Sequence, residues 1–85
     1  MTDPIYEKLT KVQEKYAQAL MEKANVVAVG IGLKQENGQY TETPALVVMV
    51  SKKMPMTSLS ANDRIPKTID GVIVDVVETG PFFAN

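Results

Sequence analysis

The sequence predicts an α+β fold in which one long N-terminal helix packs on a mostly antiparallel sheet of three to four strands. Two observations predict this architecture. Apolar residues recur at helical spacing over about the first quarter of the chain, and the later apolar segments alternate or run continuously as strands do. Because 85 residues are about the size of one small domain, we expect residues 1–85 to form a single domain with one core.

The helix is predicted over residues 4–24. Asp3 and Pro4 suit an N-cap and a first helical position, since the carboxylate accepts from free amides and proline lacks an N–H that would have no partner there. Asn25 tolerates the left-handed conformation that ends many helices. One stripe at helical spacing would be buried, and it consists of Ile5, Leu9, Val12, Tyr16, Leu20 and Ala24.

The first two strands are predicted at 26–34 and 45–51, with a hairpin turn at Asn37-Gly38 between them. The first strand has a face of large residues and a face of small ones that includes Gly30 and Gly32. We interpret the small face as the one that lets the helix approach the sheet closely. The second strand starts after Pro44 and is apolar on both faces, which is typical of a central strand.

A long connection, 51–66, separates these strands from the last two, and it could form one helical turn around 57–61. A short strand is then predicted at 67–69 and a longer one at 72–78, and a tight turn at Asp70-Gly71 joins them. The aromatic tail, 81–85, either folds back on the core or is offered to a partner.

Composition argues against most enzyme classes. The chain has neither histidine nor cysteine, so its hydroxyls lack the usual base and it has no thiolate. We therefore expect no catalytic residue, no cofactor and no metal. Nine basic and ten acidic residues give a net charge of −1, which disfavours nucleic acid and anionic membranes as partners. With no signal peptide and no apolar run of membrane-spanning length, we expect a cytoplasmic protein.

Acidic residues close together in the sequence could pair for acid–base chemistry or bind a hard metal ion, and these are Asp63, Asp70, Asp75 and Glu78. The favoured interpretation is structural: Asp70 belongs to its turn and Asp63 to a cap or turn. Asp75 shares a strand face with Ile73 and Val77, so its charge should lie near an edge, be paired, or face solvent.

Several short blocks within residues 26–80 resemble a known family, and they are 29–34, 51–55, 63–66, 69–72 and 74–80. Together they resemble an uncharacterised bacterial domain that, in longer chains, precedes a trypsin-like serine peptidase domain. The resemblance implies no activity for this chain, because the chemistry would lie in a peptidase portion that is absent here. It suggests, as a third possibility, a regulatory or inhibitory subunit for a separately encoded peptidase.

The leading hypothesis is a non-catalytic protein-interaction or oligomerisation module. Two predicted strands, 45–50 and 72–77, are apolar on both faces, but one helix covers only one face of a sheet. The long connection could cover part of the other face, and the simplest remaining cover is a second subunit or another protein. A homodimer is therefore expected, with a possible interface made of Val48, Val50, Met54, Met56, Leu59, Phe82 and Phe83.

The alternative hypothesis is a domain that binds a small ligand or an anion. Glycines after strand-like sequence invite comparison with phosphate-binding loops, although the third glycine and the following helix are missing. Lysines that follow the predicted strands could gather at one end of the sheet. The possible anion-binding residues are Gly30, Gly32, Lys34, Lys52 and Lys53.

Overall fold

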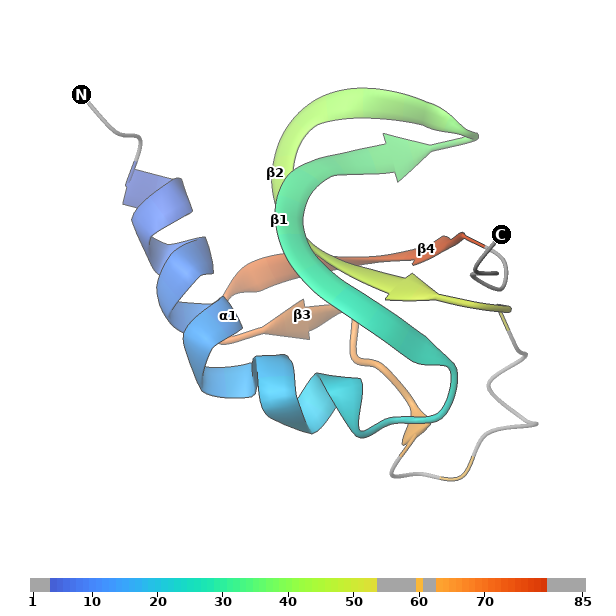
Figure 1. Ribbon diagram of the computed structural model, residues 1–85. Helices are drawn as coiled ribbons and strands as arrows, with labels where there is room; N and C mark the ends of the chain where they lie inside the picture. The colour runs from blue at the N-terminus through green and yellow to red at the C-terminus, as the bar shows by residue number, and fades with distance from the viewer. Residues whose placement is uncertain (1–3, 54–59, 61–62, 80–85) are drawn as a thin grey trace, which may run out of the picture.

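A computed structural model describes residues 4–53, 60 and 63–79 of the chain (Figure 1). Helix α1 (Pro4–Met21) is followed by strands β1 (Val26–Glu36), β2 (Gln39–Val50), β3 (Thr68–Ile69) and β4 (Val72–Glu78). The strands form one mixed sheet in the order β1-β2-β4-β3, in which only the β2–β4 pair is parallel. The predicted α+β fold, one helix on a mostly antiparallel sheet, is confirmed.

Helix α1 covers one face of the sheet, here called the helix face. Its buried residues Leu9, Val12 and Leu20 belong to the predicted apolar stripe. They pack in one core with residues of β2 and β4 that have the same orientation, namely Leu46, Val48, Val50, Val72 and Val74. The helix ends at Met21 rather than near residue 24, and Asn25 adopts the predicted left-handed conformation, with φ of 69°. The predicted cap, Asp3, lies outside the described residues.

The β1–β2 hairpin is longer than the sequence pattern indicated. Asn37 and Gly38 form its turn with φ of 53° and 79°, and β2 begins directly at Gln39. Pro44 therefore lies inside β2, opposite Leu33. The β1–β2 register shifts between Leu33 and Gln35, and proline is tolerated beside such an irregularity because fewer ladder hydrogen bonds are required there.

The long connection after β2 returns the chain to the other end of the sheet, as a parallel neighbour requires. Strand β4 consequently runs alongside β2 in the same direction, with Leu46 opposite Val74 and Val48 opposite Val76. The turn from β3 to β4 uses positive φ at Asp70 (48°) and Gly71 (82°). The helical turn predicted around 57–61 falls largely outside the described residues.

The two glycines of β1 lie on the face opposite the helix, here called the far face. Opposed residues of antiparallel strands share a face, and Gly30 and Gly32 oppose Val47 and Ala45 rather than the core residues Leu46 and Val48. The interpretation that they let the helix approach closely is wrong. In the part of the chain that the structure describes, no helix is long and apolar enough to cross a membrane.

Candidate functional site

The far face is partly covered by the hairpin itself. Strands β1 and β2 bend strongly, so that their turn end curls over the sheet (Figure 1). Between the curled hairpin and β4 lies a groove of about 250 Å³. We call it the hairpin groove, and its lining residues are Gly30, Ile31, Gly32, Leu33, Gln35, Tyr40, Val47, Met49, Val77 and Thr79.

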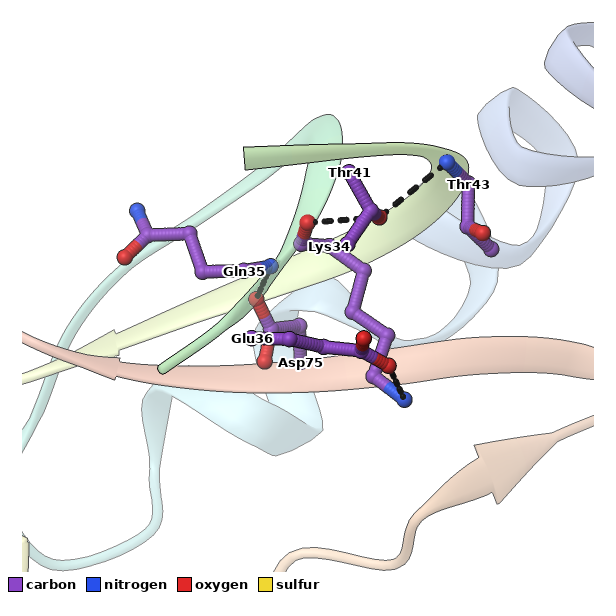
Figure 2. A network of polar contacts seen from close by, with 6 residues as sticks. All are labelled: Lys34, Gln35, Glu36, Thr41, Thr43 and Asp75. Atoms are coloured by element: carbon purple, nitrogen blue, oxygen red, sulfur yellow. Dashed lines mark hydrogen bonds and ion pairs between the residues drawn. The ribbon is translucent and has the colours of Figure 1, made fainter. Parts of the chain in front are cut away.

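A polar network fixes the curl of the hairpin (Figure 2). The Gln35 amide donates to the Asp75 carboxylate of β4 at 2.9 Å. Beside it, the Thr41 hydroxyl donates to the Lys34 carbonyl at 2.8 Å, and the Thr43 amide donates to Thr41 Oγ1 at 3.2 Å. These contacts occur where the register shifts, so side chains supply hydrogen bonds at the irregularity of the ladder.

The width of the groove depends on the glycines in its floor. A Cβ at Gly32 would lie 3.2 Å from Val47 Cγ2, whereas a Cβ at Gly30 would lie 3.9 Å from Met49 Cε. The first distance is shorter than an ordinary contact between carbon atoms. Glycine at position 32 therefore allows the floor residues of β1 and β2 to pack closely while the strands bend.

One large aromatic side chain stands at the rim of this groove. Tyr40 is 74% exposed. The far-face residues between Tyr40 and β4, including Val47, Met49 and Val77, are only half-buried. The far face thus combines an apolar hollow with a protruding aromatic ring, a combination that is frequent at protein contacts.

A second hollow of about 430 Å³ lies on the helix face, beyond the end of α1. We call it the helix-end pocket. Its apolar lining comes from Ala24, Val50, Ile65, Pro66, Val74 and Val76, and its charged lining includes Lys52, Lys53, Asp63 and Lys67. The Asp63 carboxylate accepts hydrogen bonds from the Ala24 amide and the Ser60 hydroxyl, and these bonds hold the pKa of Asp63 below its ordinary value.

The structure places the predicted interface residues differently from the prediction. Val48 and Val50 are 0% and 4% exposed because they face α1 in the core, so they are not surface residues. Their neighbours on the far face, Val47 and Met49, are the residues of β2 that line the groove. The remaining predicted interface residues lie outside the described residues: Met54, Met56, Leu59, Phe82 and Phe83.

The predicted anion-binding residues do not gather at one place. Gly30 and Gly32 line the hairpin groove, whereas Lys52 and Lys53 line the helix-end pocket on the other face. Lys34 lines neither hollow and pairs with Glu36 at 3.5 Å. Strand alternation explains this separation, because residues at the ends of different strands can point to opposite faces of the sheet.

Each of the four acidic residues singled out from the sequence contacts a different segment. Asp63 holds the turn after α1, Asp75 holds β1, and Glu78 accepts a hydrogen bond from the Lys53 amide at 2.7 Å. Asp70 accepts the Tyr16 hydroxyl at 3.0 Å and lies 3.7 Å from Lys15 Nζ. Among the described residues no group of three potential ligand side chains could hold a metal ion. The contact of Asp75 with β1 was not predicted. The sequence does contain a signal for such a contact, because a carboxylate within an apolar strand needs a polar partner.

Ser51 and Lys52, which follow β2, make separate contacts. The Ser51 hydroxyl points to Asn25 Oδ1, at 3.5 Å, and Lys52 lines the helix-end pocket. The Ser51 amide donates to the Asn25 carbonyl at 2.8 Å, so this segment is held to the turn after α1. The contacts of Ser51 therefore serve to position the chain after β2.

Comparison with known families gives a match that spans the helix and the sheet. A family model described as the NARROW LEAF 1 N-terminal domain matches residues 9–77, which include α1 from Leu9 and nearly all of the sheet. This plant family replaces the bacterial peptidase-associated domain to which the short sequence blocks were assigned, so that assignment is corrected. Short blocks of strand and turn sequence recur in unrelated sheets, whereas the family model spans the helix and the sheet together. Comparison with curated proteins gave no match.

Proposed function

This chain belongs to the NARROW LEAF 1 N-terminal domain family, and we propose that it is a non-catalytic module that forms a homodimer through its hairpin groove. The observation that carries the proposal is Tyr40, a large aromatic side chain that is 74% exposed beside an apolar hollow. Aromatic residues at such positions dominate the energetics of many protein interfaces.

The groove has the features that a two-fold interface requires. In a dimer with two-fold symmetry the same patch serves both partners, so one surface must contain both a projection and a recess. Tyr40 provides the projection, and Val47, Met49 and Val77 provide the recess. Burial of the Tyr40 ring would remove on the order of 150–250 Å² from water.

The curl of the hairpin makes this surface rigid before association. The Gln35–Asp75 hydrogen bond and the Thr41 contacts hold the turn end over the far face. A preformed surface loses less conformational entropy on binding than one that must be ordered. Association through this surface would therefore lose less conformational entropy than association through an unordered hairpin.

Sedimentation velocity over a range from low to high micromolar concentration tests the proposal. We expect concentration-dependent dimerisation of the natural sequence and at least a 10-fold weaker dimer for Tyr40→Glu, because the charge would be placed at the centre of the contact. Tyr6→Glu is the matched control, since Tyr6 is 38% exposed but lies on α1, away from the groove.

The circular dichroism spectra of both variants should match that of the natural sequence, because both replacements are at exposed positions. A well-folded protein that stays strictly monomeric at high micromolar concentration contradicts the proposal. Equal weakening of the dimer by Tyr40→Glu and Tyr6→Glu would also contradict it, because the contact would then not be located at the groove.

A further inference from the structure

The helix-end pocket has an apolar floor and a basic rim. Val50, Val74 and Val76 of the sheet, together with Ile65, form apolar walls on the helix face. Its volume of about 430 Å³ falls in the range of pockets that enclose small organic molecules, roughly 300–1,000 Å³. It lies on the opposite side of the sheet from the hairpin groove, so its occupant is independent of the proposed dimer.

The backbone that carries the basic rim is fixed by hydrogen bonds. The Lys53 amide donates to Glu78 at 2.7 Å, and the Thr79 amide donates to the Val50 carbonyl at 2.9 Å. The Val74 amide donates to the Lys67 carbonyl at 2.9 Å. Both sides of the rim are therefore attached to β4, and Lys52, Lys53 and Lys67 stay beside the pocket.

The lysine side chains of the rim have no acidic partner within the described part of the chain. None of the ammonium groups of Lys52, Lys53 and Lys67 forms an ion pair with a described carboxylate. Asp63 is already occupied by the Ala24 amide and the Ser60 hydroxyl. Asp75 contributes to the lining, but its carboxylate accepts from Gln35 of β1. Both carboxylates keep their negative charge, but their hydrogen bonds direct them away from the lysines. Three ammonium groups against two carboxylates leave the lining with a net charge of +1, next to an apolar floor.

From this charge pattern we propose that the helix-end pocket binds a small organic anion with an apolar body and one carboxylate. The apolar body lies against Val50, Val74, Val76 and Ile65, and the carboxylate faces the ammonium groups of the rim. Tight binding requires both parts of the ligand. A purely polar anion would leave the apolar floor exposed to water, and a neutral apolar molecule would leave the lysines without a counter-charge.

Titration with a matched pair of probes, followed by two-dimensional amide NMR, tests this proposal. 2-Naphthoate carries the apolar body and the carboxylate, and 2-naphthalenemethanol is a neutral molecule of similar shape. We expect 2-naphthoate to shift the amide resonances of Val50, Val74 and Val76, and to bind roughly 3- to 10-fold more tightly than the neutral probe. The resonances of Gly30 and Met49, in the hairpin groove, should stay unchanged.

A pair of double variants locates the charge effect. Lys52→Gln/Lys67→Gln should weaken 2-naphthoate binding roughly 3- to 10-fold without changing affinity for the neutral probe. Lys8→Gln/Lys11→Gln makes the same change in net charge on α1 and should leave both affinities unchanged.

Three results would overturn the proposal: no saturable shift with millimolar 2-naphthoate, equal affinity for both probes, or equal loss of affinity in the two double variants. Shifts confined to the hairpin groove would likewise place the ligand elsewhere. None of these outcomes bears on dimerisation, because sedimentation of the Tyr40 and Tyr6 variants is read without any probe.

Discussion

The Asp75 carboxylate accepts a hydrogen bond from the backbone amide of Gln35 at 2.9 Å, although the two residues are 40 positions apart. Asp75 lies in β4 and Gln35 near the end of β1, and β2 separates these strands in the sheet. The bond forms because the hairpin curls back over the far face. It joins the first and third strands of the sheet order and thereby holds the curled hairpin against β4.

Replacing Asp75 tests the importance of this bond for stability. We expect Asp75→Ala to lower the free energy of unfolding by about 1–3 kcal/mol, because the Gln35 amide loses a charged acceptor in a partly buried place. Asp75→Asn retains an acceptor oxygen and should lower the free energy of unfolding by less than Asp75→Ala does. Urea denaturation measures both values.

Amide hydrogen exchange shows whether the loss is local. The Gln35 amide should exchange much faster in Asp75→Ala. The exchange rates of the core amides should rise only as far as the loss of global stability requires. Glu36→Gln is the control, since Glu36 lies beside Gln35 but is exposed, and it should change stability by less than about 0.5 kcal/mol. Unchanged exchange at Gln35 in Asp75→Ala would show that the bond does not protect this amide.

The helix and the turns could be predicted because local chemistry determines them. Asn25, Asn37 and Asp70 adopt positive φ, and each is a residue type that tolerates this conformation. Glycine follows at 38 and 71, where φ is also positive. These features depend on a few consecutive residues, so one sequence is sufficient to predict them.

The far-face groove could not be predicted, because it depends on contacts between distant strands. Alternation showed that β1 has a large and a small face, but it does not state which face the helix covers. Likewise, Val47 and Val48 are both apolar, and only the packing of α1 distinguishes them. Asp75 gave the one useful signal, a charge that needed a partner, but the sequence did not identify Gln35 as that partner.

The two glycines of β1 differ in the space above them, which gives a matched comparison. Gly30→Ala should leave stability unchanged or raise it by up to about 1 kcal/mol, because its Cβ would make an ordinary contact at 3.9 Å. Gly32→Ala should be less stable than Gly30→Ala by about 1 kcal/mol, because Val47 Cγ2 would lie at 3.2 Å. Thermal and urea unfolding measure this difference.

A double variant separates crowding from backbone effects. If the contact with Val47 causes the loss, Gly32→Ala/Val47→Ala should recover the part of the stability that is due to crowding. Equal stabilities of Gly30→Ala and Gly32→Ala would mean that Val47 moves aside without cost, and the close packing of the groove floor would then be unimportant for the fold.

The contacts of Asp63 predict a specific dependence of stability on pH. Hydrogen bonds from Ala24 and Ser60 lower the pKa of Asp63 in the folded protein below its ordinary value of 3.8. A carboxyl whose pKa is lower when folded stabilises the fold above the unfolded pKa, and this contribution is lost as pH falls through the folded pKa. Asp63→Asn should therefore have a lower Tm than the natural sequence at pH 6, with the difference shrinking below about pH 4.

Glu14→Gln removes the same charge from an exposed position of α1 and is the control for this measurement. Its Tm should follow that of the natural sequence at each pH from 3 to 7. A difference between Asp63→Asn and the natural sequence that stays constant over this range would indicate that the loss arises from packing rather than from the ionised carboxylate.

Val47 and Val48 are adjacent, identical side chains on opposite faces of β2, so they separate stability from association. Val48 is 0% exposed in the core, and Val48→Ala should lower the free energy of unfolding by roughly 2 kcal/mol through lost burial and the cavity left behind. Val47→Ala should lower the free energy of unfolding by less than about 1 kcal/mol, since Val47 is half-buried. It should nevertheless weaken the proposed dimer several-fold, because Val47 lines the groove. Urea denaturation and sedimentation velocity on both variants measure the two effects. A dimer that is weakened by Val48→Ala but not by Val47→Ala, at a temperature where both variants remain folded, would place the contact on the helix face instead of the far face.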